Sequence, residues 1–193
     1  MKPEVHMIAI TDNPISMHYR DICAPSWTDH GYTVRHFEAL TPVDIVGANT
    51  LNITKKMRSP RREVEFTETE RAVWYSHYYS WMLCRQLDTP IIVAEHDIML
   101  LDDLDEDVFN YDIACLSHVT RSNGKTAKLA GGAYYITPRG AKILCGIKNK
   151  STEIIANSDA WIHRTCDDYG KWFMFSTTQI QDPEIGVTVI HNK

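Results

Sequence analysis

Short apolar runs alternate with amphipathic stretches along the chain, and this alternation predicts an α/β fold. Six runs rich in apolar and β-branched residues are typical of buried strands. They are Val5–Thr11, Thr33–Phe37, Pro90–Ala94, Asp112–Ser117, Ala133–Ile136 and Val187–Ile190. The run that begins at Pro90 is the clearest of them, and it leads directly into an acidic segment.

Two helices are predicted from the residues at their starts. Thr67 and Glu70 form a capping-box pattern, in which each side chain bonds the other's backbone N–H, and a helix is expected over 67–87. A threonine followed by a proline starts the second helix, which we expect over 137–147. A further helix is expected between the first two strands.

One face of the helix at 67–87 combines aromatic and polar side chains. Glu70, Trp74, His77 and Trp81 follow one another at intervals of three or four residues and share this face. Aromatic residues at such spacing are typical of a core, but a buried carboxylate or imidazole requires polar partners. We therefore interpret His77 as a structural or ligand-side group.

Size and composition indicate a single domain over residues 1–193. Hydrophobic residues make up 44% of the chain and charged residues 23%, and the net charge of -5 argues against a generally basic nucleic-acid binder. No apolar run is long enough to cross a membrane, and the start of the chain lacks the features of a signal peptide, so we expect a cytoplasmic protein. The five cysteines include no CxxC pair, which favours reduced thiols.

A basic run lies inside a stretch at about 46–66 that shows no clear periodicity. Its cations are Lys55, Lys56, Arg58, Arg61 and Arg62. One interpretation is a solvated, mobile loop. The other is a loop that closes over phosphates, because clustered guanidinium and ammonium groups bind polyanions.

Two carboxylates follow the clearest strand. Ligands of open α/β sheets collect beyond the carboxyl ends of the strands. Alternate residues of an extended chain point the same way, so Glu95 and Asp97 are expected to face one ligand together. Such a pair suits Mg²⁺ or Mn²⁺, particularly when diphosphate oxygens complete the coordination.

Five segments stand in a characteristic order along the chain. They are Ile10–Arg20, the set Thr67, Glu70, Ser76, His77 and Trp81, the triplet Glu95-His96-Asp97, the segment Gly131–Lys142, and the pair Ser158-Asp159. In this order and spacing the chain resembles glycosyltransferase family 25, the lipopolysaccharide and collagen β-galactosyltransferase type. His96 departs from the family pattern, since it stands where the family has the middle acid of a triplet.

The resemblance implies a GT-A type fold, a nucleotide-binding α/β sandwich around a mixed, mostly parallel sheet. It implies a uridine diphosphate sugar as donor, Mn²⁺ or Mg²⁺ as cofactor, and inversion at the anomeric carbon. The residues expected to bind the donor are Thr11, Asn13, Arg20, Glu70, Ser76, His77, Gly131 and Gly132, with Arg61 and Arg62 of the basic run.

Four residues receive roles in the expected transfer of a hexosyl or pentosyl group. Asp97 is the candidate metal ligand, and Glu95 is either a second ligand or a partner of the donor's sugar or ribose. Asp159 is the candidate base, although its place before an apolar stretch also suits a helix N-cap. His191 is a candidate further metal ligand, or else part of a polar tail.

The acceptor is expected to be a saccharide of a bacterial surface glycan. One alternative is a virus-encoded enzyme that glycosylates hydroxymethylated cytosine in DNA, which the basic run would favour. Another is a non-catalytic protein that binds nucleotide sugars, because the substitution at His96 alters the acidic triplet. The sequence leaves the oligomeric state open.

Overall fold

A computed structural model describes most of the chain. The described residues are 2–46, 56–59, 62–65, 67–116, 118–120, 126–128, 131–146, 158–172 and 177–179. The predicted strand at Val187–Ile190 lies outside them, as does the candidate ligand His191.

A six-stranded mixed sheet forms the centre of the described structure, with the strand order β11-β7-β10-β5-β1-β2. Its strands are β1 (Glu4–Ala9), β2 (Val34–Glu38), β5 (Ile91–Glu95), β7 (Ile113–Cys115), β10 (Ala133–Ile136) and β11 (Lys171–Trp172). β1 pairs in parallel with β2 and β5, and β7 with β11, whereas β10 is antiparallel to both β5 and β7. The predicted α/β class with a mixed, mostly parallel sheet is confirmed, and five predicted strands are present with ends shifted by at most two residues.

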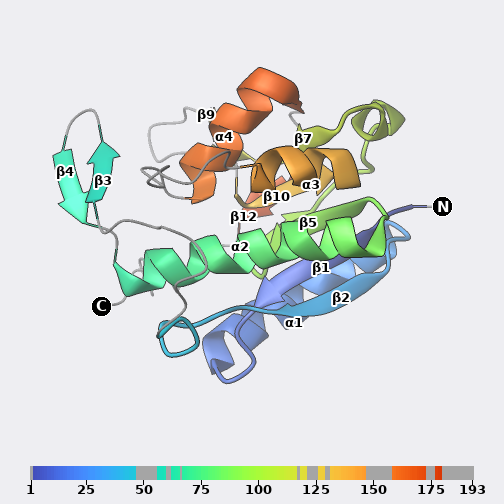
Figure 1. The fold of residues 1–193 in the computed structure, drawn as a ribbon. Coiled ribbons are helices and arrows are strands. Elements are labelled where there is room, and N and C mark those ends of the chain that lie inside the picture. Colours follow the sequence, from blue (N-terminus) through green and yellow to red (C-terminus); the bar gives the residue numbers. More distant parts are fainter. Residues whose placement is uncertain are drawn as a thin grey trace.

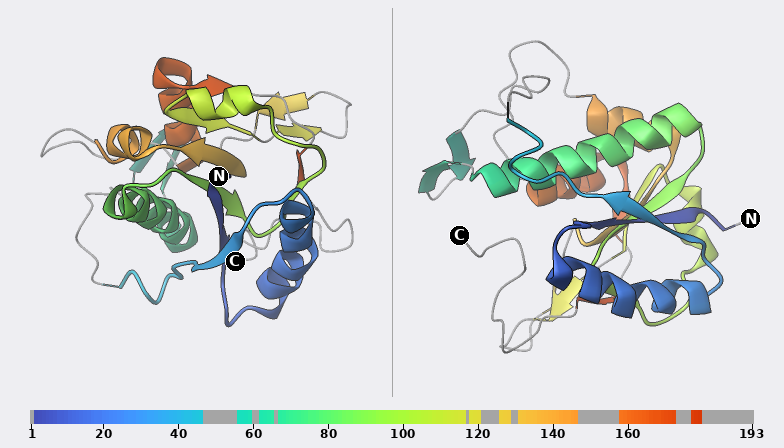
Figure 2. Two further views of the ribbon diagram at one scale, coloured as in Figure 1. Left: turned by 90° about the vertical axis from the view of Figure 1, so that its right-hand side faces the viewer. Right: turned by 90° about the horizontal axis from the view of Figure 1, so that it is seen from below.

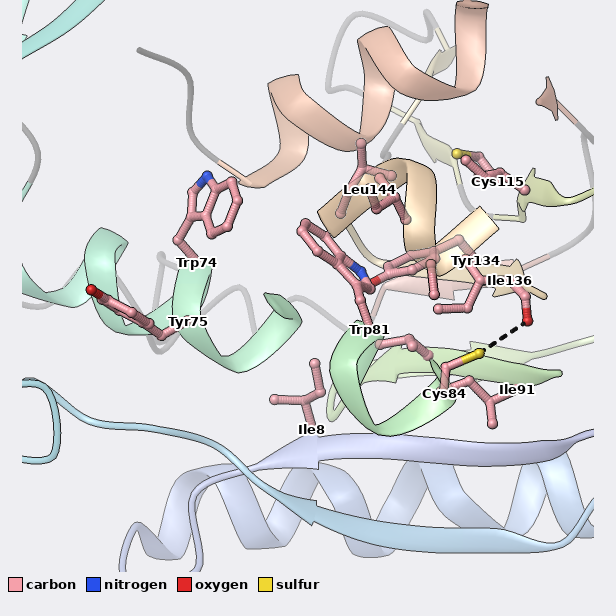
Figure 3. Packing of buried hydrophobic residues seen from close by; sticks show 14 of the residues in the cluster. Ile8, Trp74, Tyr75, Trp81, Cys84, Ile91, Cys115, Tyr134, Ile136 and Leu144 are labelled. Atoms are coloured by element: carbon pink, nitrogen blue, oxygen red, sulfur yellow. Dashed lines mark hydrogen bonds between the residues drawn. The ribbon is translucent and has the colours of Figure 1, made fainter. Parts of the chain in front are cut away.

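Helices cover both faces of this sheet (Figures 1 and 2). They are α1 (Pro14–Asp29), α2 (Glu68–Leu87), α3 (Pro138–Cys145) and α4 (Ser158–Tyr169), and a short 3₁₀ helix, η1 (Glu106–Asn110), precedes β7. Because side chains of a strand alternate between the two faces, Met7 of β1 packs in one cluster with Trp27 of α1. Its neighbour Ile8 packs in the other cluster, with Trp81 of α2 and Ile162 of α4. Figure 3 shows part of this second cluster.

Capping side chains fix where the helices begin. Asn13 accepts from the backbone N–H groups of Ile15 and Ser16, and Pro14 occupies the first turn of α1. Thr67 and Glu70 form the complete capping box of α2, as predicted. Thr137 accepts from the N–H of Gly140 at 3.1 Å, which confirms the predicted start of α3. The described part of α3 ends at Cys145, two residues before the predicted end.

Gly140 allows α3 to lie against the start of β7. A Cβ atom at this position would stand 2.0 Å from the carbonyl oxygen of Asp112, so no side chain fits there. Asp112 also accepts from the Thr137 backbone at 3.0 Å and from its hydroxyl at 2.7 Å. The helix and the strand are therefore joined through backbone contact.

Three two-stranded pairs accompany the main sheet. They are β3 (Lys56–Ser59) with β4 (Arg62–Glu65), β6 (Ile98–Leu100) with β12 (Thr177–Gln179), and β8 (His118–Thr120) with β9 (Thr126–Lys128), all antiparallel. The first pair falls within 46–66, a stretch that lacks a clear periodicity and was expected to be a loop. It extends beyond the N-terminal end of α2 in Figure 1.

Candidate active site

A pocket lies where the carboxyl ends of β1, β2 and β5 reach the N-terminal half of α2. Its volume is about 550 Å³, which includes space open to solvent. Its apolar lining consists of Ile8, Ile10, Ala39, Leu40, Pro42, Ala72 and Val73. Its polar lining consists of Thr41, Thr69, Ser76, His77, Glu95 and His96. The pocket thus occupies the sheet edge at which α/β proteins bind ligands, and its lining combines apolar walls with polar groups.

Ser76 joins two walls of the pocket. Its buried hydroxyl donates to the carbonyl of Ala72, one turn earlier on α2, at 2.9 Å. The same oxygen accepts from the backbone N–H of Leu40, in the segment after β2, at 2.8 Å. The predicted donor-side residue Ser76 therefore holds the segment after β2 against α2.

Glu95 is the last residue of β5, and its side chain is only 17% exposed. Its backbone N–H donates to the carbonyl of Gly132 at 2.8 Å. His96 and Asp97 form a turn that leads into β6, and both are buried. The chain is therefore not extended through this triplet, and the expectation that alternate side chains point the same way does not apply here.

Glu95 and Asp97 nevertheless act on each other electrostatically. The pKa of Glu95 is raised to about 7, chiefly by burial and also by the negative charge of Asp97, while His96 acts in the opposite direction. Two carboxylates that oppose each other's ionisation in a buried site favour a bound cation. The two residues therefore lie close enough to influence each other, and their shared role in binding a ligand stays a prediction.

Asp159 reaches the same site from α4. It is the second residue of that helix and lies in its first turn, so it is not the residue that precedes the helix. A Cβ atom at Gly131 would stand 2.1 Å from Oδ1 of Asp159 and 3.7 Å from Oε1 of Glu95. The predicted residues Glu95, Gly131 and Asp159 are therefore brought together, and Gly131 is required because no side chain fits between the two acids.

His77 lies behind Glu95, fully buried in α2. Its Nδ1 is 2.9 Å from the hydroxyl oxygen of Tyr134, and this oxygen accepts from Nε1 of Trp81 at 2.8 Å. Its Nε2 is 3.6 Å from Oε1 of Glu95. Burial lowers the pKa of His77 to about 4, although the charge of Asp159 acts in the opposite direction. We therefore treat His77 as neutral and its contact with Glu95 as dipolar rather than as an ion pair.

Four other predicted donor residues lie outside the pocket lining. Thr11 follows β1, donates its backbone N–H to Glu38 at 3.0 Å and bonds the same carboxylate through its hydroxyl. Asn13 caps α1, and Glu70 accepts from the N–H of Thr67 at 2.8 Å in the capping box. Arg20 pairs with Asp21 at 3.2 Å. Their part in donor binding stays a prediction.

Three predicted residues have no described side chain. Arg61 and His191 lie outside the described residues, and Arg62 is described only as part of the backbone of β4. The proposed closure of the basic run over phosphates and the third metal ligand therefore stay predictions.

Two features of the site were not predicted from the sequence. Leu40, Pro42 and Val73 line the pocket, but apolar residues in a loop and on a helix give no separate signal for this. Tyr134 completes the hydrogen bonds of His77. The next residue of the segment Gly131–Lys142, Tyr135, lies instead in the cluster on the other face of the sheet, against Phe109.

The site can be compared with what a divalent cation requires. Glu95 and Asp97 supply hard oxygen ligands, and Mg²⁺ is commonly held by one or two carboxylates together with substrate phosphates. Within the described part of the chain, no group of three or more His, Cys, Asp or Glu residues is arranged to hold a metal. The residues therefore fit a cation that the substrate helps to hold, but not a closed protein cage.

Comparison with known proteins identifies the family. The model described as Glycosyltransferase family 25 (LPS biosynthesis protein) matches residues 15–128, a range that contains α2, Glu95 and Asp97. The chain belongs to glycosyltransferase family 25 and is a glycosyltransferase. Gly131 and Asp159 lie beyond the matched range.

Two solved structures are similar to the chain in fold. One is a glycosyltransferase involved in the glycosylation of the major capsid of PBCV-1, with 10% identity, a TM-score of 0.43, and coverage of 89% of this chain and 81% of that one. The other is a putative glucose-1-phosphate thymidylyltransferase from Bacillus anthracis in complex with a sucrose, with 8% identity, a TM-score of 0.44, and coverage of 92% and 89%. No curated protein matches the sequence. Within the described residues, no helix is long and apolar enough to span a membrane.

Proposed function

We propose that the protein transfers a sugar from a nucleoside diphosphate sugar, with UDP as the carrier, to a hydroxyl group of a saccharide. The observation that carries the proposal is the placement of the pocket, whose apolar walls lead to Glu95 at the end of β5. Asp97 and Asp159 stand beside Glu95. The family description, an LPS biosynthesis protein, favours a bacterial surface glycan as the acceptor.

The nucleoside of the donor is proposed to lie in the pocket. Its apolar walls, which include Ile10, Leu40 and Val73, suit the faces of a base, and the hydroxyls of Thr41 and Thr69 suit its polar edges. This placement directs the diphosphate toward Glu95. Bound beside Glu95 and Asp97, Mn²⁺ or Mg²⁺ would neutralise charge on the leaving diphosphate.

Asp159 is proposed to act as the base. Its carboxylate would take the proton of the acceptor hydroxyl while the new bond forms at the anomeric carbon and the bond to the diphosphate breaks, with inversion. Glu95 is proposed to hold the cation or to accept a hydrogen bond from the sugar or ribose. Gly131 leaves the space in which these two acids meet.

The direct test is turnover of a panel of nucleotide sugars. The purified protein would be incubated with UDP-, GDP-, CMP- and dTDP-sugars and Mn²⁺, with saccharide acceptors and with DNA containing hydroxymethylated cytosine. Release of nucleotide and transfer to acceptor would be followed by mass spectrometry. We expect one UDP-sugar to be consumed, and we expect the reaction to be lost with a chelator or in Asp97→Asn.

The controls separate the alternatives. Asp103→Asn removes an exposed carboxylate a few residues after Asp97 in the sequence and should leave turnover unchanged. Transfer to the DNA substrate alone would overturn the saccharide acceptor. Binding of a nucleotide sugar without turnover in any combination would instead indicate a non-catalytic binding protein.

A further inference from the structure

A chain of hydrogen bonds runs through the core to the edge of the site. It begins at the indole of Trp81 and passes through the hydroxyl of Tyr134 to Nδ1 of His77, whose Nε2 faces Glu95. All three aromatic residues are buried. Trp81 and Tyr134 lie side by side in Figure 3.

The chemistry of these groups fixes the direction of each hydrogen bond. An indole N–H only donates, so the Tyr134 oxygen is the acceptor from Trp81. Burial raises the pKa of Tyr134 well above its usual value, so the hydroxyl keeps its proton. Among the described residues, the acceptor placed to receive this proton is Nδ1 of His77, at 2.9 Å.

The direction of these bonds determines the form of the imidazole. A neutral ring carries one proton, and Nδ1 cannot carry it while it accepts from Tyr134. The proton therefore lies on Nε2, which is 3.6 Å from Oε1 of Glu95. The positive end of the N–H dipole then points at the carboxylate.

We propose that His77 and Tyr134 are positioning residues for Glu95, with Tyr134 holding His77 in the tautomer that presents Nε2–H to the carboxylate. In the other tautomer, the lone pair of Nε2 would face Glu95 and repel it. This inference rests on the proposed function as far as turnover is concerned. The tautomer itself is a property of the folded protein without substrate.

The first test is NMR of protein labelled with ¹⁵N at histidine. Long-range ¹H–¹⁵N spectra distinguish a protonated from an unprotonated ring nitrogen, and the His77 signals are those missing from His77→Gln. We expect the wild type to carry its proton on Nε2. In Tyr134→Phe, Nδ1 loses the hydrogen bond that holds it as an acceptor, so a substantial Nδ1–H population is expected.

The second test measures turnover in the same variants. Tyr134→Phe should lower kcat by about tenfold, the lower end of the usual cost of removing a direct partner of a ligand, because Tyr134 acts on Glu95 only through His77; KM for the donor should be nearly unchanged. Tyr135→Phe is the matched control, because it removes a hydroxyl from the same strand on the opposite side of the sheet. His77→Gln keeps an N–H donor toward Glu95 and should retain more turnover than His77→Met, which has none.

Several results would overturn the inference. They are a proton on Nδ1 in the wild type, an unchanged tautomer in Tyr134→Phe, and equal turnover of the Gln and Met variants. If Tyr134→Phe does not fold, two measurements still test the inference. They are the tautomer of His77 in the wild type and the turnover of His77→Gln compared with that of His77→Met. If the wild type turns over no donor, the proposed function fails, and the tautomers of the wild type and Tyr134→Phe decide the inference alone.

Discussion

Glu95 carries an electrostatic cost in the folded protein, because its carboxyl group is buried beside another acid. It is a nearly buried carboxylate, it lies close to Asp97, and the imidazole beside it is neutral. A buried charge without a compensating cation is unfavourable. A cation bound beside Glu95, as proposed above, would relieve this cost.

The pKa of Glu95 predicts how stability depends on pH. Its folded-state pKa, about 7, lies above its usual value of 4.5, so the folded protein binds the proton more tightly than the unfolded chain. The resulting stabilisation of the folded state is fully present below about pH 4.5 and is lost as the pH rises through 7. Glu95→Gln cannot ionise, so above pH 7 it should be more stable than the wild type by about 1–3 kcal/mol.

Urea unfolding at pH 4.5 and pH 8, with EDTA present, measures this difference. The two proteins should have similar free energies of unfolding at the lower pH. Glu106→Gln, which changes an exposed glutamate, should behave as the wild type at both. A Glu95→Gln variant that is less stable than the wild type at pH 8 would contradict the assigned burial and charge.

Gly131 makes a second prediction at this scale. The methyl group of Gly131→Ala would stand 2.1 Å from Oδ1 of Asp159, so the acid must move away from Glu95. Turnover should fall at least about tenfold, because small misplacements of catalytic groups are costly. In an Asp159→Ala background the same alanine stands 3.7 Å from Oε1 of Glu95, an ordinary contact distance, so its added effect on the residual turnover should be small. Independent, additive losses in the double variant would show that Gly131 does not act through Asp159.

At the scale of elements, local signals in the sequence predicted most of the architecture. The apolar run before Glu95 and the caps at Thr67 and Thr137 depend only on neighbouring residues. The observed strand β5 and the observed starts of α2 and α3 therefore lie close to the predicted ones. The hairpin of β3 and β4 depends on pairing between charged strands that show no apolar alternation. The alternation rule failed at Glu95 and Asp97 because the chain turns between them.

The capping box of α2 positions the helix that forms one wall of the pocket. Thr67→Ala removes the oxygen that accepts from the N–H of Glu70 at 3.1 Å, so the free energy of unfolding should fall by about 1 kcal/mol. Thr67→Ser keeps the hydroxyl and should remain close to the wild type. Urea denaturation measures both. Equal losses in the two variants would indicate that the threonine methyl group, rather than the cap, provides the stabilisation.

At the scale of the whole molecule, the site depends on contacts between segments far apart in the chain. Glu95 and Asp97 were predicted as a pair because they are neighbours in sequence. Asp159 and Gly131 were predicted only through the family resemblance, since no local pattern shows that α4 reaches the end of β5. The pocket walls formed by Leu40 and Val73 required the folded structure.

The central claim is that this pocket binds the nucleotide of the donor, and filling the pocket tests it most directly. Val73 lines the pocket on α2, whereas Met82 lies on the same helix, exposed and outside the pocket lining. Calorimetric titration of UDP in the presence of Mn²⁺ would compare Val73→Trp, Met82→Trp and the wild type. We predict equal binding by the wild type and Met82→Trp, and binding at least about tenfold weaker in a folded Val73→Trp, because the indole occupies the space of the base. Undiminished binding of UDP by Val73→Trp would contradict this placement of the donor site.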